Sequence, residues 1–433
     1  MFREILNTIW TKIFSAILAL GILIITTQYL GADGRGLVSL IYSSIGIIGI
    51  FAGFVGGPAV IYLAAKEKMQ YLLLPIYSWI LFVAIIGSAL AWILQTVPVF
   101  YIPFIAVLAI TSSIYVVNLY IIVGHQKVRT NNVIYMLQWA INLATLVLFF
   151  SVLNQANVEF VAIALLISNI FGLAFTFHEM RKISGTVQFD WSEEVKVIKS
   201  LVSLSFFAQA AAVMYYLYNR LGIFLLNIFA ALFAVGIYSV GVNISDFILL
   251  ASLSIALVEY SRISNSTDRE YARNITIRLT KFGFLITLGI TVLLLLLPDW
   301  VFTLVFGRDF ASVHGVLLTM APGIVVFGAG IIIFNYFAGI GRNRVNAGAA
   351  VVGLVVNVLF CYLLIPLYGS MGAGIASSIS FIVMSSVLII VFLDETNTRF
   401  KELFIRSSDF TYLFRKFQKD IVLQKEMATK NKR

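Results

Sequence analysis

Two ionisable residues lie inside long apolar stretches, and they are the residues of this sequence best suited to chemistry. Arg220 interrupts the apolar run 201–227, and Asp246 lies near the middle of the run 232–258. A charge inside a bilayer is costly unless it faces a cavity or a partner, so we expect a functional role for both residues. An arginine can bind phosphate oxygens with two parallel hydrogen bonds, and an aspartate can pair with it or take up H⁺ or Na⁺.

Polar side chains accompany both residues at helical spacing. Gln209, Tyr216 and Arg220 fall on one side of the first run, and Asn243 and Asp246 share a face of the second. Such stripes suit a water-filled cavity between helices, and the predicted cavity set is Arg220, Asp246, Tyr216, Asn219, Gln209 and Asn243. Three alternatives are open: Arg220 reaching headgroup phosphates, Asp246 as a protonated structural group, and a direct pair between them across about 10 Å of membrane depth.

The sequence motifs do not indicate an enzyme. The sequence has no P-loop and no complete dinucleotide fingerprint. Its single cysteine, Cys361, and three scattered histidines leave no set with metal-ligand spacing. We therefore expect no enzyme activity, no bound metal and no cofactor, and H⁺ and Na⁺ are both open as coupling ions.

The composition defines the elements that must position these residues. Of the 433 residues, 61% are hydrophobic and 12% are charged, and the mean hydropathy is +0.98, which excludes an ordinary soluble globular protein. A spanning helix takes about 20 residues, so the apolar content predicts an all-α integral membrane fold with about twelve spans. The apolar runs are 9–30, 37–64, 71–95, 100–123, 133–153, 158–177, 201–227, 232–258, 279–297, 314–339, 346–365 and 371–393.

The basic residues orient these spans. With this assignment, 27 of the 30 lysines and arginines fall on one side of the membrane, which predicts that both termini are cytoplasmic. The net charge of +10 is then explained by loops that face one leaflet, so no nucleic-acid partner is expected. Arg35 lies on the opposite side, in the loop 31–36, where we expect a tight glycine turn or a phosphate contact.

The two halves of the chain repeat each other weakly but in order. Lys127 matches Arg342 and Arg129 matches Arg344, each at an offset of 215 residues. Matched spans lie six apart, so the halves share one orientation about an axis along the membrane normal, the symmetry of a transporter with a cavity between two bundles. These four cations and Arg35 are candidate contacts for anionic headgroups, although plain positive-inside topology explains the four at least as well.

The repeat also divides the chain, since Gly36 matches Gly236 at an offset of 200 residues. We expect a six-helix lobe, a cytoplasmic linker, a second six-helix lobe and a basic cytoplasmic tail, over 1–178, 179–200, 201–393 and 394–433. Aromatic residues interleave with lysine and arginine in the tail, which favours an amphipathic helix lying on the inner leaflet.

Several segments carry a family resemblance: LGADGRGLVSLIYSS, GGPAVIYLAAK, GHQKVRTNN, VGIYSVGVNISDFIL and IGRNRVN with the run that follows it. They resemble the Wzx-type bacterial polysaccharide flippases, which move O-antigen and capsule repeat units and belong to the multidrug/oligosaccharidyl-lipid/polysaccharide (MOP) exporter superfamily. The resemblance covers nearly the whole chain, to about residue 395. It implies a MATE/MOP-like fold, with two six-helix lobes around a cationic cavity that opens alternately to each side.

The resemblance also implies a function. It suggests a flippase that moves an undecaprenyl-diphosphate-linked oligosaccharide from the inner to the outer leaflet of the bacterial cytoplasmic (inner) membrane. Arg220 would then meet the diphosphate or an acidic sugar. Membrane lipids and other polysaccharide-assembly proteins are the implied partners. Many relatives have an acidic residue after an Asn-Arg pair where this chain has Gly222, so Asp246 is a substitute candidate for a coupling-ion site.

Two other functions are alternatives. A cation-coupled multidrug exporter of the same fold needs acidic cavity residues, whereas the spans here hold one aspartate and one arginine, which favours an anionic substrate. A membrane polysaccharide polymerase is the remote alternative, because it needs a reactive site for which the short predicted external loops leave little room.

Overall fold

The structure is a computed structural model that describes residues 2–404 apart from 58, 68, 183–190 and 267. All regular elements in this part of the chain are helical. The helices are α1 (Phe2–Gly56), α2 (Ala59–Ala64), α3 (Met69–Ile93), α4 (Ile102–Gly124), α5 (Val128–Val147), α6 (Val158–Arg181), α7 (Trp191–Phe229), α8 (Leu232–Ser264), α9 (Arg269–Leu295), α10 (Asp299–Phe306), α11 (Val313–Gly339) and α12 (Asn343–Glu395). Four short helical turns join or follow them: η1 (Val99–Tyr101), η2 (Leu148–Val152), η3 (Arg308–Ser312) and η4 (Phe400–Leu403).

Two of the helices are too long for a single membrane crossing. In the described part of the chain, ten helices are long and apolar enough to span a membrane, and α1 and α12 contain 55 and 53 residues. A straight helix of that length would measure about 80 Å, against about 30 Å for a bilayer core. Each is broken at one glycine with positive φ, at Gly31 (φ 65°) and Gly369 (φ 55°). With each counted as two crossings, the structure confirms the predicted all-α membrane fold of about twelve spans.

The break at Gly31 corrects the predicted turn in the first part of the chain. We expected a turn over 31–36, but helical geometry resumes directly after Gly31. A single residue in the left-handed region is enough to reverse the chain there, and glycine adopts it without steric cost. Arg35 is therefore a helical residue of α1 and not a loop residue. Within the predicted linker 179–200, α6 extends to Arg181 and α7 begins at Trp191, and residues 183–190 lie outside the described residues.

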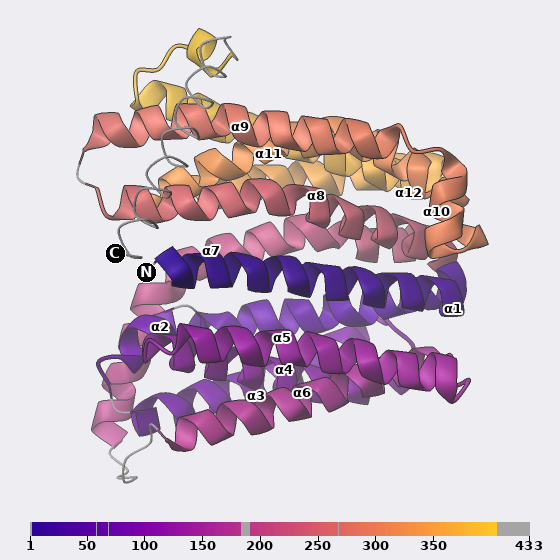
Figure 1. The fold of residues 1–433 in the computed structure, drawn as a ribbon, viewed down its shortest axis with the longest axis horizontal. Helices are drawn as coiled ribbons and strands as arrows, with labels where there is room; N and C mark the ends of the chain where they lie inside the picture. The colour runs from indigo at the N-terminus through magenta and orange to yellow at the C-terminus, as the bar shows by residue number, and fades with distance from the viewer. Residues whose placement is uncertain (1, 58, 68, 183–190, 267, 405–433) are drawn as a thin grey trace, which may run out of the picture.

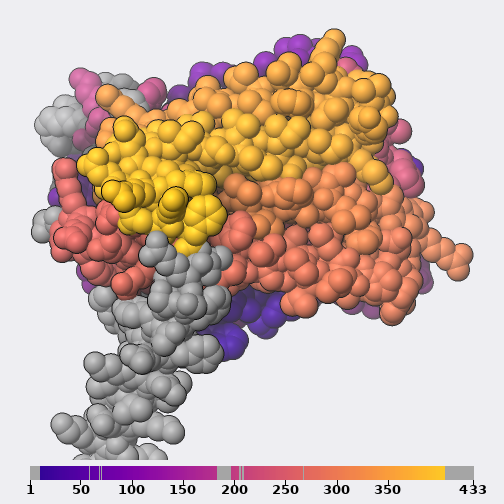
Figure 2. All heavy atoms as spheres, turned by 90° about the horizontal axis from the view of Figure 1, so that it is seen from above, coloured from indigo at the N-terminus to yellow at the C-terminus, as the bar shows by residue number. Residues whose placement is uncertain are grey.

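The twelve crossings form two groups in one bundle (Figure 1). Helices α2 to α6 lie on one side of the bundle and α8 to α12 on the other, with α1 and α7 between them. The start of α1 and the short helix α2 lie at one end of the bundle, which we call the proximal end, and α10 lies at the opposite, distal end. Viewed from above, α9 to α12 form one continuous face of the molecule (Figure 2). Exposed side chains on these helices are large and apolar, among them Leu293, Val355 and Leu367, as expected of a surface that meets lipid.

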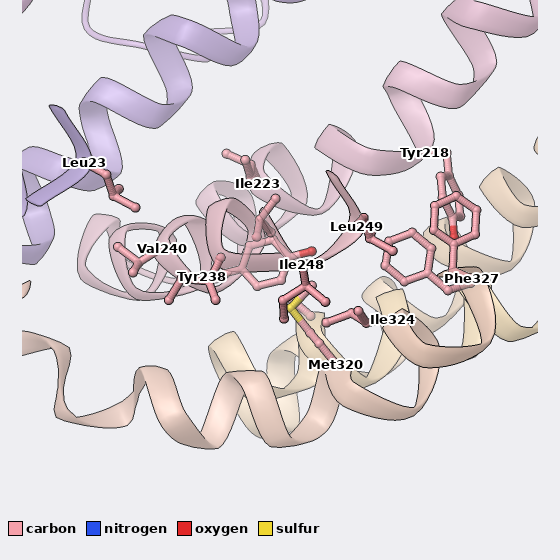
Figure 3. Packing of buried hydrophobic residues seen from close by; sticks show 14 of the residues in the cluster. Leu23, Tyr218, Ile223, Tyr238, Val240, Ile248, Leu249, Met320, Ile324 and Phe327 are labelled. Carbon is pink, nitrogen blue, oxygen red and sulfur yellow. The ribbon is translucent and has the colours of Figure 1, made fainter. Parts of the chain in front are cut away.

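Buried aromatic residues fix α7 to the second group of helices. Figure 3 shows Tyr218 of α7 beside Phe327 of α11 in this core. The ring of Tyr218 also meets Phe381 of α12 edge-on at 5.2 Å, and Phe327 stacks on Phe381 at 4.6 Å. These contacts hold the middle of α7 and thereby position Asn219 and Arg220, the next two residues of that helix.

The internal repeat appears in the structure as a pair of equivalent ion pairs. Lys127 Nζ lies 3.3 Å from Glu179 Oε2, which joins the start of α5 to the end of α6. In the second half Arg342 pairs with Glu395, which joins the start of α12 to its end. Lys127 and Arg342, which match each other in the repeat, therefore each form an ion pair that links two crossings at the proximal end.

At the distal end the two groups meet through the matched glycines. A Cβ atom on Gly36 would lie 2.3 Å from the carbonyl oxygen of Leu232, and one on Gly236 would lie 1.9 Å from that of Ala32. The backbones of α1 and α8 therefore touch, which only glycine permits. Asp309 Oδ2 also accepts a hydrogen bond of 3.1 Å from the backbone N–H of Ala32, directly after the break in α1. These contacts join α1 to α8 and to Asp309 of η3 at the distal end.

Candidate functional site

Arg220 and Asp246, the two charged residues that lie away from the ends of the apolar runs, form an ion pair. Arg220 Nη2 of α7 lies 2.7 Å from Asp246 Oδ2 of α8, a distance typical of a charge-assisted hydrogen bond. The sequence left this pair open because the two positions differ in depth. The long arginine side chain covers that offset, since α7 and α8 form an antiparallel pair joined by a short turn.

Both members of the pair retain accessible surface in the middle of the bundle. The side chain of Arg220 is 24% exposed and that of Asp246 is 44% exposed. Arg220 lines a cavity of about 140 Å³ between α1, α7 and α8, and Asp246 lines a smaller void on the other side of the pair. The guanidinium therefore faces an internal space, and it is not directed toward headgroup phosphates at the surface.

A second arginine lines the same cavity. Arg35 of α1 is only 4% exposed, and its Nη1 donates a hydrogen bond of 3.1 Å to Thr26 Oγ1. Its Nε has no hydrogen-bond partner within the described residues. The sequence interpretation missed this position because it assigned Arg35 to a loop. The available signal was the helical spacing of Arg35, Ser39 and Ser43, which places all three on one face of α1.

The cavity with the two arginines is lined by unsatisfied polar atoms. Besides Arg35 Nε, the buried hydroxyls of Ser39 and Tyr42 have no partner within the described part of the chain. Buried polar groups in native proteins are nearly always hydrogen-bonded, so these atoms require water or a ligand. A volume of about 140 Å³ has room for several waters or for an anionic group. Two arginines and one aspartate leave the site with a net positive charge.

A larger cavity of about 390 Å³ continues toward the proximal end. One wall is the glycine face of α1, formed by Gly46, Gly49, Gly53 and Gly56, and Gly57 directly after the helix extends it. Tyr216 of α7 lines both cavities, and its hydroxyl donates a hydrogen bond of 3.3 Å to the carbonyl of Ser43. A Cβ on Gly46 would lie 1.8 Å from that hydroxyl, so the small residue is needed where Tyr216 crosses α1.

The structure brings most of the predicted cavity residues together. Arg220, Tyr216 and Asn243 line the smaller cavity, and Gln209 lines the larger one, where its Nε2 donates a hydrogen bond of 2.6 Å to the carbonyl of Ile50. Asn219 lies apart from them, beside Asp246 in the void within the second group of helices. The predicted set therefore surrounds the Arg220–Asp246 pair on two sides.

The predicted headgroup cations divide into three kinds. Lys127 and Arg342 form intramolecular ion pairs, and Arg35 lies inside the bundle. Arg129 and Arg344 are exposed at the proximal end. The amphipathic helix predicted for the tail falls largely on residues 405–433, outside the described residues.

Solved structures define the class of this fold. The chain is similar to an inward-facing multidrug resistance MATE-family transporter of the MOP superfamily, with a TM-score of 0.68, 16% identity, and coverage of 88% of this chain and 94% of that one. It is also similar to the lipid II flippase MurJ in an inward closed conformation, with a TM-score of 0.70, 15% identity, and coverage of 91% and 88%. A MOP-superfamily transporter from Pyrococcus furiosus matches with a TM-score of 0.63 and 16% identity over 91% and 95%. The protein therefore has the MATE/MOP-like fold that its sequence predicts.

One curated relative is a flippase. The chain is 23% identical over 224 residues to the probable low-salt glycan biosynthesis flippase Agl15 of Haloferax volcanii. This match covers 51% of the chain and spans about half the length of that relative, 47%. No protein-family model matches the chain. These relatives are transporters and flippases and not enzymes, in agreement with the sequence-based prediction.

Proposed function

We propose that the protein is a flippase for a lipid-linked oligosaccharide, of the Wzx type, and that Arg35 and Arg220 bind the diphosphate that joins lipid to sugar. The observation that carries this proposal is the cavity that both arginines line from α1 and α7. The MOP fold and the similarity to a glycan biosynthesis flippase support it. The proposed substrate is an undecaprenyl-diphosphate-linked repeat unit, such as that of an O-antigen or a capsule.

The chemistry of the cavity suits a diphosphate. A guanidinium forms two parallel hydrogen bonds with phosphate oxygens, and its attraction to an anion is stronger inside a low-dielectric bundle than in water. Without substrate, Asp246 compensates the charge of Arg220, whereas no carboxylate among the described residues pairs with Arg35. An entering diphosphate would satisfy the Nε of Arg35 and compete with Asp246 for Arg220. The lipid chain would stay in the bilayer.

The direction of transport follows from the proposed orientation. The proximal end holds most of the lysines and arginines, so we place it in the cytoplasm, with both termini there and the protein in the bacterial cytoplasmic membrane. The lobes 1–178 and 201–393 would then rock about the linker 179–200 and carry the headgroup from the inner to the outer leaflet. Membrane lipids and other polysaccharide-assembly proteins are the proposed partners.

A second candidate function is a cation-coupled multidrug exporter. The partly exposed carboxylate of Asp246 favours it, because cationic substrates need an acidic group in the cavity. Asp246 is also the proposed site for a coupling H⁺ or Na⁺ in either function. The two arginines beside it favour the flippase, because they repel a cationic drug.

The test is translocation of a fluorescent undecaprenyl-diphosphate oligosaccharide in proteoliposomes. Wild type is compared with Arg220→Ala and Arg220→Lys, and Arg308→Gln is the matched control because Arg308 is an exposed arginine at the distal end. Loss in Arg220→Ala with partial recovery in Arg220→Lys, in folded protein, supports the proposal. Unchanged transport in Arg220→Ala removes this residue from the mechanism, and no transport by wild type favours the exporter.

A further inference from the structure

A groove of about 400 Å³ lies outside the central cavities, between α1 and α5 near the proximal end. It is lined by Trp10, Thr11 and Phe14 of α1 and by Arg129, Asn132, Val133 and Met136 of α5. It shares no lining residue with the cavities around Arg220. Both of its walls belong to the first half of the chain, so it does not open between the two groups of helices.

The rim of the groove is apolar and open to the outside of the bundle. Trp10 is 68% exposed, and Phe14 and Val133 are each more than two-fifths exposed. The floor is more polar, since Thr11 and Asn132 are buried. Tryptophan is enriched at membrane–water interfaces, where its ring meets acyl chains and its N–H meets water. The groove therefore lies where an acyl chain and a headgroup would both find partners.

Arg129 supplies a charge for the headgroup. It is exposed, and it makes no hydrogen bond or ion pair within the described residues. Its neighbour Lys127 differs in this respect, because Glu179 holds it at 3.3 Å and also accepts a hydrogen bond of 2.5 Å from Lys182. Glu179 thus pairs with Lys127 and Lys182, and among the described side chains no carboxylate pairs with Arg129. An anionic ligand can therefore compensate the charge of Arg129 without displacing any of these carboxylates.

We propose that this groove binds an anionic glycerophospholipid, with its phosphate on Arg129 and an acyl chain along Trp10, Phe14 and Val133. Arginine binds phosphate oxygens with two parallel hydrogen bonds, and anionic lipids gather at cationic residues on the cytoplasmic surface. We assign the groove to a resident phospholipid and not to a transported lipid, because transport requires access to the central cavity. The assignment does not depend on the proposed flippase activity.

The experiment measures retention of phosphatidylglycerol by the full-length protein. Protein in mixed micelles of phosphatidylglycerol and phosphatidylcholine is examined by native mass spectrometry at graded lipid ratios. We expect wild type to retain phosphatidylglycerol selectively and Arg129→Gln to bind it about fivefold more weakly, since one cation near the surface contributes about that factor. Lys127→Gln is the matched control, because it removes the same charge two residues away from a cation that is already paired.

A second variant distinguishes binding in the groove from non-specific attraction of the anionic lipid to a cation. Val133→Trp fills the groove and keeps Arg129, so we expect it to lose the retained lipid as well, with circular dichroism confirming the helical fold. Equal losses in Arg129→Gln and Lys127→Gln would overturn the proposal, because the effect would then be non-specific attraction. Displacement of the retained phosphatidylglycerol from wild type by an undecaprenyl-diphosphate probe would also overturn it and assign the groove to the transported lipid.

Discussion

Arg35 and Arg220 line one cavity from two different helices, and of the two, Arg220 alone pairs with a carboxylate within the described part of the chain. The Nε of Arg35 has no partner within the described residues, although the side chain is almost fully buried. A buried guanidinium in this state is costly unless water or an anion compensates it. The asymmetry suggests that Arg35 is the first group to gain from an anion and that Arg220 joins when its pair with Asp246 opens.

This difference between the two arginines predicts that Arg35→Gln strongly slows transport. A hydrogen bond to a charged group contributes about 1.5–3 kcal/mol, so transport of the diphosphate probe should fall by about tenfold to a hundredfold. Arg35→Lys should recover part of the transport, because lysine keeps the positive charge but lacks the planar guanidinium group that forms two parallel hydrogen bonds. The rate of probe translocation in proteoliposomes measures both. Equal rates in Arg35→Gln and in the distal control Arg308→Gln would contradict the role of Arg35.

The Arg220–Asp246 pair predicts opposite effects on binding and stability for Asp246→Asn. Removal of the carboxylate leaves the cavity more positive, so a diphosphate probe should bind more tightly. The same change should lower the free energy of unfolding by about 1–2 kcal/mol, less than for a fully buried pair because both side chains keep accessible surface. Probe titration and thermal unfolding in detergent measure the two effects.

Asp33→Asn is the control for that substitution, because Asp33 is exposed next to the break in α1. It should change neither quantity. Weaker probe binding in Asp246→Asn would mean that the carboxylate helps to hold the substrate, which would favour a cationic ligand and the exporter function.

The sequence predicted the spans because their signal is local. Apolar runs of about 20 residues need a bilayer whatever surrounds them, so the twelve crossings could be recognised without tertiary information. The breaks were harder to place. A run of Gly31, Ala32, Asp33 and Gly34 is typical of a loop, and nothing local shows that one residue reverses the chain and that the others continue as a helix.

The site was predicted only in part, because its geometry depends on how the helices pack against each other. Arg220 and Asp246 stood out because each interrupts an apolar run. Their distance depends on how α7 and α8 pack, which the sequence does not show. Arg35 shares its cavity with residues of α7 and α8, and α1 contacts α8 at Gly36 and Gly236, which are far apart in the chain. The pairing of Lys127 with Glu179 likewise depends on two crossings that lie side by side.

The contact between η4 and α9 predicts an acid-sensitive segment at the proximal end. The backbone N–H of Arg399 donates a hydrogen bond of 3.0 Å to Glu402, and Arg273 Nη2 lies 2.6 Å from its carboxylate; both lower the pKa of Glu402. A lowered pKa means that the stabilisation is present above the ordinary carboxyl value and is lost as the pH falls through the lower folded value.

Amide exchange of residues 396–404 should therefore accelerate between about pH 5 and pH 3, after correction for the intrinsic rate. Glu402→Gln should show faster exchange already at neutral pH and no further acid-dependent step. An acid response of equal size in Glu402→Gln would assign the effect to other carboxylates.

The crossing of Tyr216 over Gly46 predicts a second-site rescue. Gly46→Ala places a Cβ where the Tyr216 hydroxyl lies, so the ring must move and its hydrogen bond to Ser43 is lost. Overpacking of this kind costs about 1–3 kcal/mol. Tyr216→Phe in the same chain removes the nearest clashing atom, the hydroxyl oxygen, but leaves the ring carbon Cζ 2.5 Å from the added Cβ, so it should restore only part of the thermal stability. Gly289→Ala, where a Cβ would meet nothing within 4 Å, is the neutral control.

The backbone contact of Gly36 and Gly236 predicts a way to open the distal end. Gly236→Ala puts a Cβ against the carbonyl of Ala32, so α1 and α8 must separate there, and the hydrogen bond from Ala32 to Asp309 must weaken. Conformations open at the distal end should become more populated. The measurement is maleimide labelling of a cysteine at Ser39, which lines the cavity, in a Cys361→Ser background.

The reagent is a membrane-impermeant maleimide added to whole cells, so only a distally open cavity reacts when the proximal end faces the cytoplasm. We expect faster labelling in Gly236→Ala than in the parent and no change in Gly348→Ala, where the added Cβ meets nothing within 4 Å. Labelling that stays slow in Gly236→Ala while the protein remains folded would mean that helices α1 and α8 absorb the extra methyl without parting. The glycine contact would then be a packing feature of the closed state and not the element that keeps the distal end shut.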